Sequence, residues 1–320
     1  MQKIKCAVIG VGYLGKFHAE KYTQLPDAEL VAVCDIDPQL GQPIADQFNV
    51  PLVTDYRELI DQVDAVSVVT PTPLHYQISH DCLTAGVHVL VEKPITQTLE
   101  QARQLIALAQ QQPVIFQVGH LERFNSARLA LDDFLDSPRF IESQRLAPFN
   151  PRNTDVNVIL DLMIHDIDII QSIVQSPVKH IDAQGAPILT SYVDIANARI
   201  VFENNCVANV TASRISFKTE RKTRIFQPES YISIDFHNKQ FAVFRRGEGE
   251  MFPGIPEISR EQSTFEQSDA LFLEIQAFVN SITHNTPPLV SGEDGYQALV
   301  TASQITERIH QYLATQNAIK

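Results

Sequence analysis

Three glycines, Gly10, Gly12 and Gly15, follow the first apolar run of the chain with the spacing G-x-G-x-x-G. Glycines at these positions permit a tight turn, let a phosphate approach the backbone and allow the next helix to pack closely, while the N-terminus of that helix attracts phosphates. Asp35 ends the second apolar run, twenty residues after Gly15, where a carboxylate binds ribose hydroxyls. The spacing predicts a dinucleotide site. The alternative is a glycine turn with an unrelated surface aspartate.

The same carboxylate distinguishes between the two nicotinamide dinucleotides, because it repels the 2′-phosphate of NADP. NADP sites usually supply a nearby Arg or Lys, whereas the segment between Asp35 and Arg57 contains neither. We therefore expect NAD as the cofactor. The residues expected to contact it lie in the glycine turn and at the ends of three later strands: Gly10, Gly12, Tyr13, Leu14, Gly15, Asp35, Thr70, Pro71, Thr72, His75, Glu92 and Lys93.

A lysine stands at the end of a later apolar run, in the triplet Glu92-Lys93-Pro94. Open parallel sheets bind ligands at the carboxyl ends of their strands, and partial burial there lowers the pKa of a lysine toward a value useful for proton transfer. We expect Lys93 to lie beside the nicotinamide and the substrate hydroxyl, with a surface lysine at a strand end as the alternative. His75, after the preceding strand, is expected to be a structural, hydrogen-bonding residue.

Asp161, His165 and Asp168 are spaced i, i+4 and i+7, so they line one face of a helix predicted over residues 157–174. That helix contains no Lys, Arg or Glu, and it is therefore expected to be buried nearly all round. A buried charge without a partner is too costly, so the polar stripe should face a partner or a polar cleft. A stripe packed on its own domain, with its hydrogen bonds satisfied, is the alternative.

The hydrophobic pattern indicates the scaffold that must position these residues. The first 122 residues alternate short apolar runs with helical patterns, which is typical of a doubly wound parallel sheet covered on both faces. Thr98 and Gln101 form a capping box ahead of a helix over 99–109. The predicted strands are residues 4–9, 30–34, 65–69, 87–91 and 114–118.

After residue 123 the pattern changes to a helix followed by strand-like stretches from 178 to 244, with a hairpin turn at Asn204 and Asn205. Helices are expected over 271–282 and 292–313, and residues 247–264, rich in Gly, Pro and Glu, are expected to form a mobile surface loop. We divide the chain into an NAD-binding Rossmann domain at 1–122 and an α+β domain at 123–320 for substrate binding and oligomerisation.

Composition excludes several classes of protein. A length of 320 residues suits two domains, and a net charge of −13 argues against a large nucleic-acid or anionic-membrane surface. The four cysteines lie too far apart for a zinc site or a redox dithiol, and no metal is expected. No apolar run approaches the roughly 18 residues of a membrane span, and the N-terminus shows no basic-then-apolar leader, so a cytoplasmic location is expected.

Five basic residues lie between positions 214 and 224 of a chain whose net charge is negative, and Arg152 precedes the 157–174 helix. Such a reversal of the local field would assist an anionic substrate, although charges on an exposed hairpin or a subunit interface are the commoner explanation. Arg suits bidentate phosphate contacts, so Arg152, Asp161 and His165 are the expected substrate-binding residues. The basic run consists of Arg214, Lys218, Arg221, Lys222 and Arg224.

The glycine motif at residues 10–15, Glu92-Lys93-Pro94 and Asp161-x-x-x-His165, in this order, resemble the glucose-fructose oxidoreductase, inositol dehydrogenase and MocA (Gfo/Idh/MocA) family over the whole chain. The resemblance implies a Rossmann domain followed by an α+β domain with a large, mainly antiparallel open sheet that commonly forms homodimers or homotetramers. It implies hydride transfer between a sugar or cyclitol carbon and NAD, with Lys93, Asp161 and His165 as catalytic residues. Whether Lys93 or His165 is the formal base stays open.

One departure narrows the resemblance, since many relatives carry glycines where this chain has residues 155–159. That variant, with Arg152 upstream and the stretch 214–227 downstream, is similar to bacterial UDP-N-acetylglucosamine 3-dehydrogenases. It implies oxidation of the 3-hydroxyl of a nucleotide sugar, in lipopolysaccharide biosynthesis. An inositol or simple-sugar dehydrogenase is the nearer alternative, and a non-enzymatic NAD-dependent sensor or regulator is an alternative of another class.

Overall fold

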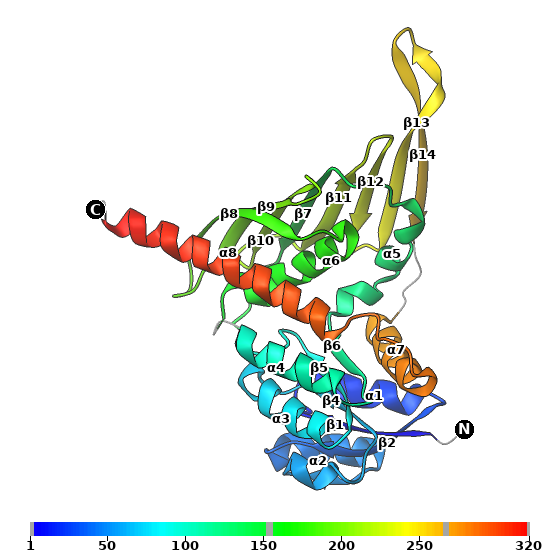
Figure 1. The fold of residues 1–320 in the computed structure, drawn as a ribbon, viewed down its shortest axis with the longest axis vertical. Helices are drawn as coiled ribbons and strands as arrows, with labels where there is room; N and C mark the ends of the chain where they lie inside the picture. The colour runs from blue at the N-terminus through cyan, green and yellow to red at the C-terminus, as the bar shows by residue number, and fades with distance from the viewer. Residues whose placement is uncertain (1–2, 152–155, 265–268, 319–320) are drawn as a thin grey trace. The chain divides into compact units, whose positions relative to one another are not determined.

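The structure is a computed structural model that describes residues 3–151, 156–264 and 269–318 (Figure 1). Its contacts divide the chain into two compact units, Met1–Phe124 with Asp269–Gln297, and Asn125–Ser268 with Ala298–Lys320. Two domains that follow one another in the sequence would need only one boundary. Here the chain leaves the first unit and Asp269–Gln297 returns to it. The domain boundary at 122/123 stays a prediction.

The first unit contains a six-stranded sheet whose pairs are all parallel, in the order β3-β2-β1-β4-β5-β6. The order reverses between β1 and β4, and ligands bind at such a switch point, beyond the carboxyl ends of the strands. The predicted parallel, doubly wound sheet is confirmed, and β3 is an additional short strand. The strands are β1 Ile4–Ile9, β2 Ala28–Cys34, β3 Leu52–Val53, β4 Ala65–Val68, β5 His88–Glu92 and β6 Phe116–Gly119.

Helices cover both faces of this sheet (Figure 1). Helix α1 contacts α2 and α7, whereas α3 contacts α4. The capping box predicted at Thr98 and Gln101 is present at the start of α4. The helices are α1 Gly15–Gln24, α2 Pro38–Phe48, α3 Thr72–Thr84, α4 Leu99–Gln110 and α7 Ala270–His284, with the short 3-10 turns η1 Tyr56–Leu59 and η2 Leu121–Phe124.

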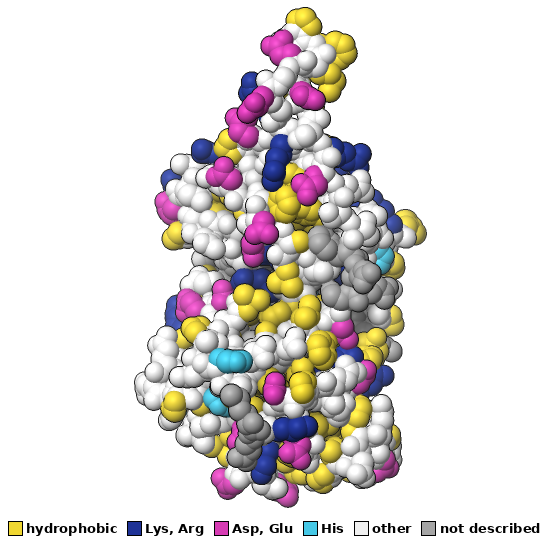
Figure 2. Space-filling view, turned by 90° about the vertical axis from the view of Figure 1, so that its right-hand side faces the viewer, with side chains coloured by type: hydrophobic (Ala, Val, Ile, Leu, Met, Phe, Trp, Pro, Cys, Tyr) yellow, Lys and Arg dark blue, Asp and Glu magenta, His cyan; other side chains and the backbone are white. Residues whose placement is uncertain are grey.

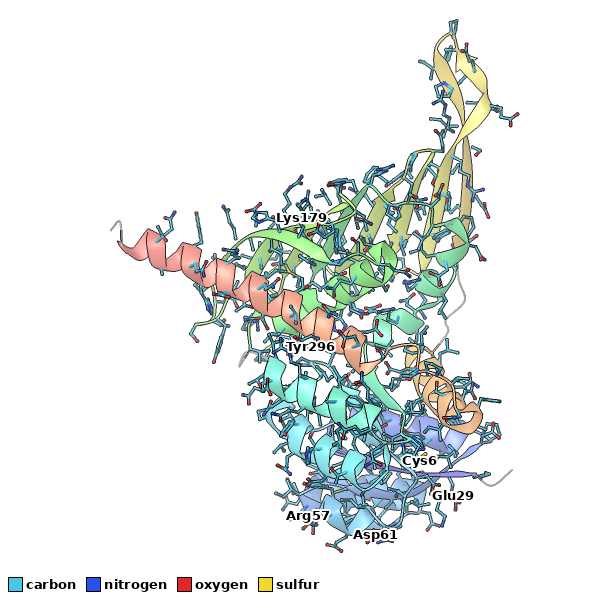
Figure 3. All side chains as sticks on the ribbon, viewed as in Figure 1. Cys6, Glu29, Arg57, Asp61, Lys179 and Tyr296 are labelled. Carbon is cyan, nitrogen blue, oxygen red and sulfur yellow. The ribbon has the colours of Figure 1, made fainter. Side chains whose placement is uncertain are left out.

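The returning segment 269–297 is joined to the first unit by apolar packing and by polar contacts. Ile275 and Phe278 of α7 are buried in the core of this unit, and the Gln117 side chain donates to the Glu274 carbonyl at 3.2 Å. Near the start of α8 (Gly292–Ala318), the Tyr296 hydroxyl accepts a hydrogen bond from Arg103 Nε at 2.8 Å (Figure 3). These partners lie far apart in sequence, which explains why the return was not visible in it.

The second unit contains an eight-stranded sheet in the order β14-β13-β12-β11-β7-β10-β9-β8. Neighbouring strands are antiparallel except for β7 and β10, which are parallel. The large, mainly antiparallel sheet and the hairpin turn at Asn204 and Asn205 are thus confirmed. The strands are β7 Phe140–Leu146, β8 Val178–Ala186, β9 Ile195–Phe202, β10 Val207–Ser213, β11 Glu220–Phe226, β12 Ser230–Asp235, β13 Gln240–Phe252 and β14 Ile255–Thr264.

Helices pack on one face of this sheet (Figure 1). Helix α6 (Ile164–Val174) follows a π-helical turn, η4 (Ile159–Met163), and the later part of α8 lies on the same face. Alternate strand residues such as Ile141 and Ile232 are buried beneath them, which gives the unit its core. The short helix α5 (Ser126–Leu129) and the 3-10 turn η3 (Asp132–Phe134) precede the sheet.

The expectation of a mobile surface loop over 247–264 is wrong, because β13 and β14 form one long hairpin that ends at Gly254. Both faces of its outer half are exposed, so the sequence there lacks the alternation of apolar and polar residues that is typical of a half-buried strand. Cross-strand pairing, not burial, holds the hairpin together, as at Phe252 and Ile255. Hydrophobic side chains gather at its tip, at the top of Figure 2.

The four cysteines are buried and free. Cys6 lies on β1, inside the first unit (Figure 3). Burial raises the pKa of Cys34 and Cys82 to about 12, so both remain thiols at neutral pH. None of the helices in the described part of the chain is both long and apolar enough to span a bilayer.

Candidate active site

The glycine turn between β1 and α1 leaves backbone open to a ligand. Gly10 has a positive φ of +87°, and a Cβ there would lie 2.8 Å from the Val69 carbonyl oxygen, so no larger residue fits. A Cβ on Gly15 would lie 1.9 Å from the Gly10 oxygen, whereas one on Gly12 would meet no atom within 4 Å. Two glycines close the turn and Gly12 faces open space, as a pyrophosphate cradle requires.

Asp35 lies beside this turn, just after β2. Its Oδ2 accepts the Val11 N–H at 2.9 Å and its Oδ1 accepts the Asp37 N–H at 3.0 Å, so both oxygens are held in place. Tyr13 in the turn and Ile36 next to Asp35 expose large apolar side chains, with relative exposures of 69% and 88%. A held carboxylate next to exposed apolar side chains suits an adenosine, and the residues present therefore fit NAD.

The connection after β4 is tied to the segment after β5 by His75. Its ring is buried, with Nδ1 2.9 Å from the Pro94 carbonyl oxygen and Nε2 2.8 Å from that of Thr70. Burial lowers the pKa of His75, against the opposing influence of both carbonyls and of Glu92. The ring therefore bridges the ends of two adjacent strands, which is the structural role expected for it.

Glu92 is the last residue of β5 and Lys93 follows it, and the Lys93–Pro94 peptide bond is cis. Glu92 Oε1 lies 3.1 Å from His18 Nε2 on α1, and Glu92 Oε2 accepts the Lys93 N–H at 3.2 Å. Burial raises the pKa of Glu92, but the His18 hydrogen bond and the charges of His18, Lys93 and His75 outweigh it and hold that pKa below its usual value. The Glu92 carboxylate is thus ionised at neutral pH and holds the backbone of Lys93.

His18 was not anticipated from the sequence. It follows Gly15 by three residues, on the buried side of α1, and that position is the only local signal. The partner, Glu92, is 74 positions away in the chain. Only the parallel sheet brings the two side chains together.

In the second unit, Asp161 lies in the π-helical turn η4 and His165 in the first turn of α6. Both are partly exposed, whereas Asp168 is only 2% exposed, so the polar stripe does not continue to the third position. The sequence predicted a uniform helix here. Its first part is instead π-helical, a geometry that recurs at functional sites.

A buried ion pair that the sequence did not reveal fixes α6 on the sheet. Arg145 Nε on β7 donates to Asp166 Oδ2 at 2.6 Å, and its second amino group lies 3.3 Å from Oδ1. Ser143 Oγ also donates to Asp166 Oδ1, at 3.0 Å. Because Asp166 and His165 are adjacent on α6, a contact that restricts the rotation of the helix also restricts the position of His165.

Most of the basic run between 214 and 224 has protein partners. Arg214 is buried and donates to the carbonyls of Val156 and Val193. Three other members pair with acidic residues: Lys218 with Glu220, Lys222 with Asp235 and Arg224 with Glu142. These contacts favour the structural explanation of the run. Arg152 lies outside the described residues.

The site residues predicted in the first unit come together at the carboxyl ends of β1, β2, β4 and β5. Lys93 belongs to that unit, whereas Asp161 and His165 belong to the second. Among the residues that the structure describes, no group of three or more His, Cys, Asp or Glu side chains is arranged to hold a metal ion.

Comparisons with known proteins identify relatives of both units. Residues 4–120 match the model of the oxidoreductase family with an NAD-binding Rossmann fold, and residues 127–232 match that of the GFO/IDH/MocA C-terminal domain. The UDP-N-acetylglucosamine 3-dehydrogenase of Acidithiobacillus ferrooxidans is 36% identical, over 98% of this chain and 99% of that protein. Its structure superposes with a TM-score of 0.92, covering 98% and 99% of the two chains.

More distant relatives are inositol dehydrogenases. The scyllo-inositol 2-dehydrogenase (NAD(+)) of Bacillus subtilis is 27% identical over 91% of this chain and 90% of that protein. The scyllo-inositol dehydrogenase of Lactobacillus casei, solved with NAD(H) and scyllo-inositol, has a TM-score of 0.81 at 25% identity, covering 97% and 98% of the two chains.

Proposed function

Since this chain belongs to the Gfo/Idh/MocA family of NAD-binding oxidoreductases, we propose that it oxidises the 3-hydroxyl of a nucleotide sugar such as UDP-N-acetylglucosamine. The observation that carries the proposal is the similarity to the A. ferrooxidans enzyme, which extends over nearly the full length of both chains. The similarity to inositol dehydrogenases is weaker, so oxidation of inositol or of a simple sugar is the second candidate.

The first unit holds the cofactor in this proposal. Gly10, Gly12 and Gly15 cradle the pyrophosphate and Asp35 binds the adenosine ribose. The remaining contacts come from Tyr13, Leu14, Thr70, Pro71, Thr72, His75, Glu92 and Lys93. NAD, when bound, supplies the hydride acceptor.

The chemical step is assigned to Lys93, Asp161 and His165. Asp161 orients the His165 imidazole, and either His165 or Lys93 accepts the proton of the substrate hydroxyl. Lys93 donates a hydrogen bond to the oxygen as negative charge develops on it, and Glu92 and the His75 bridge hold the lysine in place. Lys93 and His165 both remain candidates for the formal base, and a pH–rate profile of each variant would distinguish them.

Three further assignments complete the proposal. Arg152, with Asp161 and His165, contacts the substrate, and its guanidinium binds the diphosphate. We assign the reaction to the cytoplasm and to lipopolysaccharide biosynthesis, an assignment that the resemblance to the nucleotide-sugar dehydrogenases supports. The protein acts as a homodimer or homotetramer assembled through the sheet of the second unit.

An aromatic row on that sheet supports the assembly. Phe140, Phe226, Tyr231 and Phe244 lie side by side on adjacent strands, with ring centroids 5.6, 4.9 and 5.3 Å apart, and Arg260 lies over the last ring. The four rings are half-buried and alternate with core residues, so they lie on the face away from the described helices. Such a row on an uncovered sheet face is typical of a subunit interface.

The test of the proposed reaction compares initial rates of NADH formation with UDP-N-acetylglucosamine, free N-acetylglucosamine and myo-inositol. We expect the nucleotide sugar to have the highest kcat/KM, and Arg152→Ala to raise its Michaelis constant. A preference for the free sugar or for inositol would replace the first candidate with the second. Absence of NADH with every substrate of a broad sugar panel would favour a sensor that has lost the chemistry.

A further inference from the structure

A pocket of about 320 Å³ opens in the second unit beside the turn that carries Asp161. Its size is at the lower end of the range for small-molecule sites, which suits a heterocycle with a sugar attached. The walls combine aliphatic and aromatic groups with a few polar ones. They include Asn157, Leu160, Ser191, Tyr192, His310 and Leu313.

The loop that forms one wall, residues 187–193, is held by a buried carboxylate. Asp194 Oδ2 accepts the backbone N–H groups of Ile188, Leu189 and Thr190 at 2.7, 2.7 and 2.9 Å. Burial raises the pKa of Asp194, but these bonds outweigh it and lower that pKa to about 2. Arg214 Nε lies 3.5 Å from the other carboxylate oxygen, so the loop is fixed before any ligand arrives.

This fixed loop holds large apolar side chains in solvent. Ile188, Leu189 and Tyr192 have relative exposures of 58%, 60% and 45%. Exposed Phe217 lies on a neighbouring loop, which is joined to the first one through the Arg214 N–H bond to the Asp194 carbonyl at 3.0 Å. Large apolar side chains that an ordered loop holds in solvent are typical of a binding surface.

The position of the pocket connects it to the chemistry. The Val158 N–H donates to the Val193 carbonyl at 2.9 Å, so the loop is attached to the segment that leads into η4. Leu160 lines the pocket and Asp161 is the next residue. The pocket therefore borders the π-helical turn that carries Asp161.

We propose that this pocket binds the uridine of the nucleotide-sugar substrate, with the Tyr192 ring stacked on the base. Stacking on an exposed aromatic ring is a general way to hold a base, and Ser191 and His310 are available to hydrogen-bond its polar edge. The diphosphate is the linker between the pocket and the reacting sugar. The inference rests on the proposed function, because only a nucleotide substrate has a base to place here.

The experiment uses Tyr192→Ala, the conservative Tyr192→Phe and the matched control Tyr312→Ala, which removes another exposed tyrosine of the same unit outside the pocket. Steady-state kinetics with UDP-N-acetylglucosamine and calorimetric titration with UDP alone are measured for each. We expect Tyr192→Ala to weaken UDP binding and raise KM at least tenfold, with kcat changed less than threefold. Tyr192→Phe and Tyr312→Ala should stay within twofold of the unchanged protein.

The outcomes separate the two proposals. If the unchanged protein oxidises UDP-N-acetylglucosamine and Tyr192→Ala still binds UDP normally, the uridine pocket is wrong and the proposed function stands. If the unchanged protein neither binds UDP nor oxidises the nucleotide sugar, both are wrong. A Tyr192→Ala variant that changes sedimentation but not UDP affinity would identify the patch as a contact between copies of the chain, which also overturns the uridine assignment.

Discussion

Asp35 and Glu92 are held by protein donors before any ligand binds. Asp35 accepts two backbone N–H bonds at the glycine turn, and Glu92 contacts His18 and the Lys93 N–H. Preorganised groups need no rearrangement when a ligand or a transition state develops charge beside them. At the scale of single residues, the nucleotide edge of the first unit is therefore ready for its cofactor.

Asp35 should determine the choice of cofactor. We expect NADH to bind at least tenfold more tightly than NADPH, because the carboxylate repels a 2′-phosphate and no basic residue lies between Asp35 and Arg57. Asp35→Asn, which keeps the shape but removes the charge, should narrow that ratio. Fluorescence titration of both cofactors measures it, with Asp37→Asn as the control. Equal affinities in the unchanged protein would contradict the assignment.

Lys93 and His165 should act in the chemical step and not in cofactor binding. Lys93→Ala and His165→Ala are each expected to lower kcat about a hundredfold or more, with the dissociation constant of NADH nearly unchanged. Stopped-flow and steady-state rates, with NADH titration as the control, provide the measurement. A variant that keeps most of its turnover would show that its residue is structural.

A buried ion pair and the Ser143 hydroxyl join α6 to the sheet of the second unit, in surroundings that are mainly apolar. Arg145 and Asp166 are both nearly inaccessible to solvent. Apolar side chains tolerate a small rotation of a helix, whereas a bidentate pair does not, so the pair selects the rotation that leaves His165 partly exposed. At the scale of elements, we therefore infer that this pair fixes the rotation of α6, the helix that carries His165, relative to the sheet.

Breaking the pair from one side should be costly. Asp166→Asn or Arg145→Met alone is expected to lower the free energy of unfolding by about 3–5 kcal/mol, because a buried charge loses its partner. The double variant Arg145→Met/Asp166→Leu should recover most of that loss yet have a reduced kcat, since rotation is no longer selected. Urea unfolding and kinetics test this. Additive single effects would show that the two side chains are not coupled.

Asp194, which holds the loop over residues 187–193, should make the free energy of unfolding depend on pH under acidic conditions. A carboxyl with a lowered pKa contributes stability that is fully present above its ordinary pKa of 3.8 and is lost as the pH falls toward its folded value of about 2. Asp194→Asn should therefore be less stable at pH 7, by about 1–3 kcal/mol. The difference should shrink between about pH 4 and pH 2. Urea unfolding at several pH values measures it, with exposed Asp182→Asn as the control.

At the scale of the whole molecule, each unit has its own hydrophobic core, built mainly from buried aliphatic residues. The sheet of the second unit has helices on one face and the aromatic row on the other. A sheet with one helix-covered face and one apolar, half-exposed face is suited to pairing with a second copy of itself.

Charging the aromatic row should therefore disrupt assembly. We expect the unchanged protein to sediment as a dimer or tetramer and Tyr231→Asp to sediment as a smaller species, since a carboxylate among stacked rings cannot be buried without a partner. Analytical ultracentrifugation decides this, with Tyr312→Asp on α8 as the control. A monomer in the unchanged protein would remove the sheet interface from the proposal.

Local features were predictable from the amino-acid sequence: the glycine turn, the strand runs of the first unit, the capping box at Thr98 and the approximate bounds of α7. Each depends on residues within one or two turns, where propensity and period dominate. The hairpin over residues 247–264 was not predictable in this way. Strands that are exposed on both faces have no alternation of apolar and polar residues, and cross-strand pairing holds them together.

Contacts between residues far apart in the chain were not predictable from the sequence and depend on the fold. His18 contacts Glu92, 74 positions away, and Arg145 contacts Asp166, 21 positions away. Neither spacing matches the period of a helix or a strand, so no sequence pattern predicts the contact. The order and register of the two sheets create these contacts. Burial makes them important for stability, because a polar group withdrawn from water costs free energy unless it has a hydrogen-bond partner inside the fold.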